Sequence, residues 1–258
     1  MTTVPPSPLR RSVTGHVLVV AHRGLSAEEP ENTMRSFRRA AEVGCDLIEL
    51  DVHLSSDGVP VVIHDETLER TTDGHGRVTE RTWKELRTLD AGRGERIPSL
   101  EEVVTWAVAG SIGLSVEIKQ PTPALGLPLY DGIADRVVGL LRSAALGRCL
   151  VHSFDHPTIR QVRALWPDAA TAISYGGGTF VDALGLGRAA AASGVHPWWA
   201  WVSPELCSAA HAAGMHVHAW GATSPPRREE VEALVRAGVD SVDANDPRLV
   251  RAMLAAIG

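Results

Sequence analysis

Two acidic residues interrupt an apolar stretch of the chain at residues 47–52. Glu49 and Asp51 lie two positions apart, and the side chains of a β-strand alternate between its faces, so both carboxylates would share one face while Ile48 and Leu50 take the other. Buried carboxylates repel each other and lose hydration, so a strand tolerates such a pair mainly where a cation or a solvated cleft relieves the charge. A salt-bridged or solvated pair at a strand end is the simpler alternative to a metal site.

Other strand-like segments end in groups that could cooperate with this pair. One segment ends at His22 and Arg23, another ends at His64, and a third carries Glu117 and Lys119 on one face. In a barrel of parallel strands, the carboxyl ends of the strands meet at one mouth, where the catalytic groups of such barrels lie. We therefore expect these side chains and the carboxylate pair to point at the same site.

These residue types favour metal-assisted chemistry on a phosphate ester. Three carboxylates without a cysteine ligand suit a hard cation, Mg²⁺ or Ca²⁺, and such an ion can bridge phosphoryl oxygens. The planar guanidinium of Arg23 can bind phosphate through two donors, and Lys119 adds a point charge. Histidine titrates near neutrality, so His22 and His64 could divide the acid–base work, one accepting a proton from the nucleophile and the other donating one to the leaving oxygen.

The elements that must position these groups alternate along the chain. Amphipathic segments that end in glycine are followed by short β-branched or apolar runs, which predicts helices alternating with parallel strands. The predicted strands are 17–22, 47–53, 59–64, 114–118, 149–154, 171–175, 195–201, 215–220 and 239–243. The predicted helices are 33–43, 99–109, 131–145, 156–166, 181–193, 203–213, 227–237 and 246–257, with a short one near 82–89.

This pattern predicts one α/β domain built as a TIM (β/α)8 barrel. A chain of 258 residues suits such a barrel. The runs 47–53 and 59–64 are too close to enclose a crossover helix, so one of them should continue or decorate the barrel. Residues 66–98 break the rhythm and are predicted to be an insertion. We expect residues 1–15, rich in proline and arginine, to be a flexible N-terminal segment, with the single domain over 16–258.

Composition narrows the class of protein. Lysine and arginine total 25 against 31 acidic residues, a formal charge of −6, which disfavours a nucleic-acid partner. The three cysteines have no metal-ligand spacing and indicate a reduced, cytoplasmic protein. No signal-peptide run or bilayer-length apolar segment is present in the sequence. None of these features determines the oligomeric state.

Taken together, the motifs resemble the glycerophosphodiester phosphodiesterase family. They appear in family order from about residue 16 to 247. In chain order, the matching motifs are His22-Arg23-Gly24, Pro30-Glu31-Asn32-Thr33, Glu49-Leu50-Asp51-Val52, Ser56-Asp57-Gly58, Val61-Val62-Ile63-His64-Asp65, Leu68-Glu69-Arg70-Thr71-Thr72-Asp73-Gly74, Ile97-Pro98-Ser99-Leu100-Glu101-Glu102, Glu117-Ile118-Lys119 and Gly238-Val239-Asp240.

The resemblance implies a barrel of the phospholipase-C-like phosphodiesterase type with a small insertion after the His64 strand. It also implies metal-dependent hydrolysis of small glycerophosphodiesters to sn-glycerol 3-phosphate and an alcohol. In that scheme Glu49, Asp51 and Glu117 bind the metal, and His22 and His64 form the acid–base pair. Arg23 and Lys119 bind the phosphate, and Trp220 lines the glycerol side.

Two alternatives to this activity stay open: a lysophospholipase D-type reaction at the same site, or a non-catalytic barrel that binds a phosphorylated ligand. The chain departs from the family pattern at Trp220-Gly221-Ala222-Thr223, where Trp-Thr-Val-Asn is usual, and at Asn245-Asp246-Pro247. These departures leave the leaving alcohol and head-group preference undetermined. Trp198, Trp199 and Trp201 could form a lipid-facing lip or pack between strand and helices.

Several further histidines lie on predicted strands. His53 shares the face of the acidic pair and could be an additional ligand or support one. His152, His216 and His218 are predicted to form a polar layer inside the barrel, where they pack or support the site and do not take part in catalysis.

Overall fold

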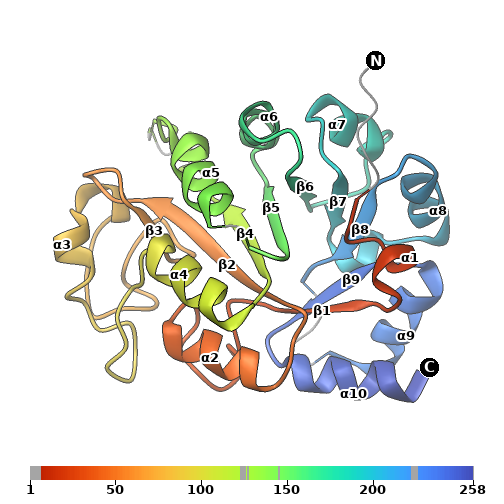
Figure 1. Ribbon diagram of the computed structural model, residues 1–258, viewed down its shortest axis with the longest axis horizontal. Helices are drawn as coiled ribbons and strands as arrows, with labels where there is room; N and C mark the ends of the chain where they lie inside the picture. Colours follow the sequence, from red (N-terminus) through yellow and green to blue (C-terminus); the bar gives the residue numbers. More distant parts are fainter. Residues whose placement is uncertain (1–6, 123–125, 127, 145, 222–225, 258) are drawn as a thin grey trace.

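The computed structural model describes residues 7–122, 126, 128–144, 146–221 and 226–257, and it shows a closed barrel surrounded by helices (Figure 1). Strand β2 is a parallel neighbour of β4, the strands from β4 to β9 are successive parallel neighbours, and β1 pairs with both β9 and β2, which closes the ring. This confirms the predicted TIM barrel. The barrel strands are β1 (Leu18–Ala21), β2 (Leu47–Leu54), β4 (Leu114–Ile118), β5 (Cys149–Ser153), β6 (Ala170–Tyr175), β7 (Gly194–Pro197), β8 (His216–Ala219) and β9 (Ser241–Ala244).

Helices cover the outside of the ring, and each predicted helix is present. Their starts follow from the sequence: Ser99 and Glu102 form a capping box, and Thr33, Asp155 and Ser203 each accept a hydrogen bond from the backbone of a first helical turn. The surrounding helices are α2 (Met34–Glu42), α4 (Leu100–Gly110), α5 (Ile133–Ser143), α6 (His156–Leu165), α7 (Ala183–Ala189), α8 (Pro204–Ala212), α9 (Arg228–Ala237) and α10 (Pro247–Ile257).

The interruption in the rhythm is a hairpin followed by an irregular unit. Strand β3 (Pro60–Val62) pairs antiparallel with the end of β2 and lies outside the ring, so the second of the two close runs decorates the barrel. Residues 66–98 follow, with a 3-10 helix η1 (Val78–Glu80) and α3 (Trp83–Leu86), and extend to one side in Figure 1. A separate apolar cluster stabilises this unit; it contains Val61, Ile63, Leu68, Val78, Leu86, Ala91 and Ile97.

The register of the strands decides which side chains meet inside the barrel. Glu117 on β4 is the Cα partner of Asp51 on β2 and of His152 on β5, so these three positions form one row across three strands. Paired residues of parallel strands direct their side chains to the same face. Glu49 lies one alternation below Asp51, opposite Ser115. The row therefore places carboxylates and an imidazole side by side in the interior.

The expectation of a flexible N-terminal segment is wrong for residues 7–15. Ser7 is fully buried, its amide donates to the carbonyl of Gly214 at 3.0 Å, and Leu9 is 2% exposed in a cluster with apolar residues of β1, β2, β5 and β6. The short helix α1 (Arg11–Thr14) follows, and the amide of Arg11 donates to Asp240 Oδ1. The apolar contact of Leu9 with the barrel interior outweighs the loop-like composition around it.

The predicted strand 195–201 is shorter than expected, since β7 ends at Pro197 and Trp199–Trp201 form a 3-10 helix. Among the described residues, no helix is both long and apolar enough to cross a membrane.

Candidate active site

The turn after β1 brings Arg23 against the acidic residues of β2. Arg23 has a φ of 56°, in the left-handed region that is uncommon for a non-glycine residue. Its amide donates to Glu49 Oε2 at 2.9 Å. The next residue must be glycine, because a Cβ on Gly24 would lie 2.2 Å from Ser36 Oγ. The His-Arg-Gly motif thus orders the turn that positions Arg23.

Asp51 is the centre of an ion-pair network at the mouth. Its Oδ2 accepts from Asn32 Nδ2 at 2.8 Å and lies 3.2 Å from Arg23 Nε, while Oδ1 lies 3.0 Å from Lys119 Nζ. Lys119 Nζ also lies 2.5 Å from Glu117 Oε1. Two cations therefore lie among three buried carboxylates, of which Asp51 has the most partners.

The electrostatics of the three carboxylates differ accordingly. Burial opposes the charge of Asp51, but Lys119 and Arg23 hold its pKa well below the usual value. Burial raises the pKa of Glu49 well above its usual value, and repulsion from Asp51 and Glu117 adds to the effect. Burial also raises the pKa of Glu117, although Lys119 opposes the shift. Negative charge at Glu49 and Glu117 is thus incompletely balanced by the side chains around them.

The cationic partners have the opposite shifts. Burial lowers the pKa of Lys119, but Asp51 and Glu117 more than offset this, and the net result is an increase. The same holds for Arg23, where burial is outweighed by Asp51, Glu49 and Glu31. Both side chains are therefore charged and directed into the mouth.

Glu49, Glu117 and His152 form a group that suits a metal ion. One oxygen of each carboxylate and one ring nitrogen of His152 lie within 4.8 Å of one another, and all three side chains are buried. His152 Nε2 has no hydrogen-bond partner among the described residues. A divalent cation would supply both the missing positive charge and a partner for that nitrogen, so these residues fit the ion that the carboxylate pattern predicts.

His22 and His64 each have one ring nitrogen held by a partner. His22 Nδ1 donates to Asn245 Oδ1 at 2.7 Å, and His64 Nδ1 donates to Asp65 Oδ1 at 2.6 Å. In both rings Nε2 is then the nitrogen available for proton transfer. Burial is the main cause of a lowered pKa for His64, which also interacts with the charges of Asp51, Lys119 and Arg23.

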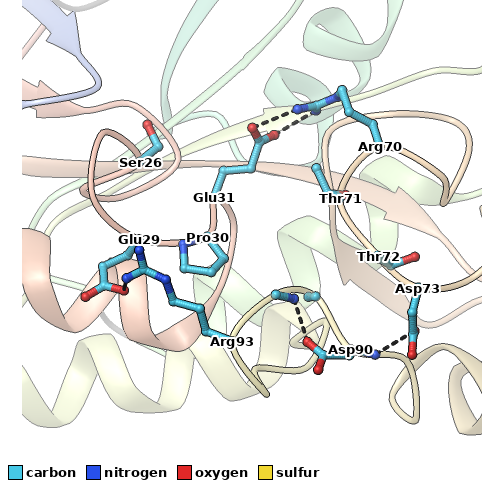
Figure 2. A pocket seen from close by; sticks show the side chains of 12 residues that line it. Ser26, Glu29, Pro30, Glu31, Arg70, Thr71, Thr72, Asp73, Asp90 and Arg93 are labelled. Atoms are coloured by element: carbon cyan, nitrogen blue, oxygen red, sulfur yellow. Dashed lines mark hydrogen bonds and ion pairs between the residues drawn. The ribbon is translucent and has the colours of Figure 1, made fainter.

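The insertion supplies Arg70, which binds two acidic side chains, Asp65 and Glu31, beside His64. Arg70 Nε donates to Asp65 Oδ2 at 2.6 Å, and its two terminal nitrogens donate to Glu31 at 2.9 and 2.8 Å. Glu31 in turn accepts from Arg23. Figure 2 shows the Glu31–Arg70 ion pair at one edge of a pocket of about 680 Å³, which lies between the loops that carry Ser26, Asp73 and Arg93. The pocket therefore borders the mouth of the barrel on the insertion side.

An aromatic wall borders the mouth on the opposite side. The Trp220 indole donates to the carbonyl of Tyr175 at 3.0 Å and contacts the Phe154 ring edge-on at 5.2 Å between centroids. The Lys119 ammonium lies 6.0 Å from the Phe154 ring centre. Trp220 thus borders the predicted site. Of the divergent motif that follows it, Ala222 and Thr223 lie outside the described residues.

Of the remaining sequence candidates, His152 joins the site and His53 does not. Both nitrogens of His53 are occupied, by the Tyr130 hydroxyl at 2.8 Å and the His64 carbonyl at 3.0 Å. His216 and His218 lie inside the barrel beside His196, which completes the predicted polar layer.

The tryptophan cluster matches neither of its two interpretations fully. Trp198, Trp199 and Trp201 are half-buried and contact one another, with Trp198 at the centre.

Asn32 and Asn245 both lie in motifs noted above, but the sequence pattern assigned no role to either. In the structure they bind Asp51 and His22, respectively.

Known proteins with similar sequences belong to one family. The model of the glycerophosphoryl diester phosphodiesterase family matches residues 22–249. A glycerophosphodiester phosphodiesterase from Caldanaerobacter subterraneus subsp. tengcongensis is 37% identical over 238 residues, which cover 89% of this chain and 94% of that protein.

Solved structures give the same result. An Oleispira antarctica phosphodiesterase, whose structure is described as a complex with the product sn-glycerol-3-phosphate, superposes with a TM-score of 0.80 at 27% identity and covers 94% of this chain and 98% of its own. A glycerophosphodiester phosphodiesterase from Agrobacterium tumefaciens superposes with a TM-score of 0.77 at 27% identity, covering 92% and 99%. The chain therefore belongs to the glycerophosphoryl diester phosphodiesterase family.

Proposed function

We propose that this protein hydrolyses glycerophosphodiesters to sn-glycerol 3-phosphate and an alcohol, with the help of a divalent metal ion. Membership of the family makes it a phosphoric diester hydrolase. The observation that carries the proposal is the presence, at one mouth, of under-neutralised carboxylates beside two histidines whose Nδ1 atoms are held by Asn245 and Asp65. The relative with bound sn-glycerol-3-phosphate supports the choice of product.

Glu49, Asp51 and Glu117 are the proposed metal ligands, and carboxylate oxygens suit Mg²⁺ or Ca²⁺. When bound, the ion would polarise the phosphoryl oxygens and offset charge that grows in the transition state. Asp51 is paired with Lys119 and Arg23 in the structure. Binding of an anionic phosphate would give both cations a new partner, which frees Asp51 for the metal and explains how Arg23 and Lys119 serve the substrate.

His22 and His64 are the proposed acid–base pair. One imidazole takes the proton from the attacking hydroxyl, which forms the new bond to phosphorus. The bond from phosphorus to the leaving alcohol breaks, and the other imidazole gives its proton to that oxygen. The attacking group is either water or the neighbouring glycerol hydroxyl, and the second route passes through a cyclic phosphate, which water then opens to sn-glycerol 3-phosphate.

Two substitutions test this proposal. Glu49→Gln and His64→Ala should each abolish metal-dependent hydrolysis of glycerophosphocholine or a chromogenic phosphodiester while the protein still unfolds cooperatively. Glu101→Gln and His75→Ala are matched controls, because both residues are exposed. Assays run with Mg²⁺, Ca²⁺, Mn²⁺ or a chelator identify the metal requirement. Full activity in either site variant would overturn the assignment, and tight diester binding without turnover would favour the non-catalytic alternative.

A lysophospholipase D-type activity is favoured by one observation at the aromatic wall. Phe154 is 46% exposed although it lies next to Trp220, and Leu129 on the same side of the mouth is 51% exposed. Apolar side chains in this position could contact an acyl chain. Faster turnover of lysophosphatidylcholine than of glycerophosphocholine would support this activity, and a Phe154→Ser variant should remove that advantage.

We also propose a cytoplasmic location. Cys45, Cys149 and Cys207 are all unpaired in the structure, which is typical of a reducing compartment. Cell fractionation of the native host tests this directly.

A further inference from the structure

We propose that His152 is a ligand of the same metal ion as Glu49 and Glu117, which makes this a mixed nitrogen–oxygen centre that prefers Mn²⁺ and Co²⁺ to Mg²⁺ and Ca²⁺. This inference rests on the proposed metal dependence. It departs from the all-oxygen site that the sequence alone predicts.

The register of the sheet places His152 beside the acidic residues. His152 is the Cα partner of Glu117 across the β4–β5 pair, and both side chains are buried. A ring nitrogen of His152 lies within 4.8 Å of one oxygen of Glu49 and one of Glu117. Small rotations of these side chains would bring all three atoms to coordination distance of one ion.

Hydrogen bonding leaves one nitrogen of His152 for the metal. Nδ1 lies 3.1 Å from Ser174 Oγ on the neighbouring strand, which fixes the orientation of the ring. Nε2 has no partner among the described residues, although the side chain is only 6% exposed. A buried nitrogen without a partner is costly, and a metal bond removes that cost.

The other buried histidines differ from His152 in their hydrogen-bond partners or in their position: His196 also has a ring nitrogen, Nδ1, without a partner among the described residues, but it lies outside the group formed with the carboxylates. His53 has protein partners on both ring nitrogens, and so does His216, whose Nδ1 lies near Ser7 and Ser193 and whose Nε2 lies near His196. His196 Nε2 lies 3.2 Å from His216 Nε2, and its ring lies 4.9 Å from that of His152. His196 is not part of the group formed with the carboxylates. It is therefore a matched control: a neighbouring, fully buried imidazole outside the proposed ligand set.

An imidazole ligand changes which ion is preferred. Carboxylate and water oxygens suit Mg²⁺ and Ca²⁺, whereas nitrogen ligands raise the relative affinity for first-row transition ions. Mn²⁺ and Co²⁺ accept both donor types and have spectroscopic signals that report on the ligands. The preference should therefore depend on His152.

The experiment measures metal binding by the full-length protein without substrate. Mn²⁺ bound to the wild type should show a nitrogen coupling in pulsed electron paramagnetic resonance, and protein grown with ¹⁵N-histidine should show the corresponding shifted coupling. In His152→Ala, affinity for Mn²⁺ and Co²⁺ should fall by at least about ten- to a hundredfold, the nitrogen coupling should disappear, and affinity for Ca²⁺ should change less than threefold. His196→Ala should keep the coupling and the affinity.

The outcomes separate this inference from the proposed activity. The wild-type measurement needs no variant, so it decides the question even if His152→Ala does not fold. Absence of the coupling in the wild type, or its persistence in a folded His152→Ala variant, would overturn the assignment of His152. Nitrogen coordination in a protein that hydrolyses no diester would leave His152 as a ligand and refute only the proposed activity.

Discussion

The two halves of the barrel interior differ in the charge of their buried side chains. Strands β1, β2 and β4, with the turns that follow them, bring buried ions together, among them Arg23, Asp51 and Lys119. Strands β5, β7 and β8 bring neutral imidazoles and an aromatic wall instead. In the first half Asp51 and Glu117 have counter-ions within 4 Å, whereas each imidazole of the second half relies on hydroxyls, carbonyls or another ring. His152 lies on the boundary, next to Glu117.

From this difference we expect residues of the charged half to take part in the reaction and residues of the neutral half to support the structure. Groups of the charged half can bind a metal and phosphate, because their charges are fixed before the substrate arrives. Burial keeps the imidazoles of the neutral half uncharged, and it lowers the pKa of His216 to about 4. We therefore expect substitutions in the charged half to change activity most, and those in the neutral half to change stability and its pH dependence.

The largest expected effect comes from removing a histidine of the charged half, compared with removing a histidine of the neutral half. His22→Ala should lower kcat by about 10²–10⁴-fold, because it removes one imidazole of the proposed acid–base pair. His218→Ala should lower kcat less than about tenfold, because the His218 Nδ1 contact with Ser241 Oγ only supports the interior. Steady-state kinetics on one diester at saturating metal measures both. Equal losses of kcat in the two variants would contradict the proposed difference between the halves.

Sequence pattern predicted most of the charged half. Strand alternation put Glu49 with Asp51 and Glu117 with Lys119, and the position at a strand end selected His22. The reason is that these groupings are local: each depends on two residues of one strand or on where a strand stops. The helices and the barrel followed from equally local patterns of glycine, caps and apolar runs.

The contacts that the sequence did not predict join distant segments. Glu117 and His152 meet because β4 and β5 pair in a specific register, which no local pattern specifies. Asn245 reaches His22 across 223 positions of the chain. Likewise, Ser7 contacts His216 across 209 positions of the chain, and composition gives only the propensity of such a segment to be loop-like.

A second prediction tests the neutral half through acid. The pKa of His216 is about 4 in the folded protein because burial penalises its charged form, although Asp240 and the carbonyl of Ser193 partly oppose this. An unfolded histidine titrates near 6.5. The unfolded chain therefore binds a proton first as pH falls, and stability present above pH 6.5 is lost towards pH 4. For this one group the loss is about 3 kcal/mol.

His216→Gln should therefore show a smaller fall in the free energy of unfolding between pH 7 and pH 4.5 than the wild type, measured by urea denaturation. His75→Gln, a change at an exposed position, is the control and should follow the wild-type curve. An unchanged pH dependence in His216→Gln would mean that the buried imidazole does not couple folding to protons.

The smallest expected effect is a gain in stability within the charged half. Burial and the neighbouring carboxylates raise the pKa of Glu49, so its contribution to stability is largest below the unfolded value and is lost as pH rises towards neutrality. Glu49→Gln removes this penalty and can keep the bond from the Arg23 amide through its own carbonyl oxygen. In chelator at pH 7.5, the variant should be more stable than the wild type by on the order of 1 kcal/mol. Saturating metal should reverse the order, because the ion stabilises only the protein that binds it. Greater stability of the wild type in chelator would show that Arg23 and Lys119 already neutralise the site, and that its carboxylates carry no excess charge for a metal to balance.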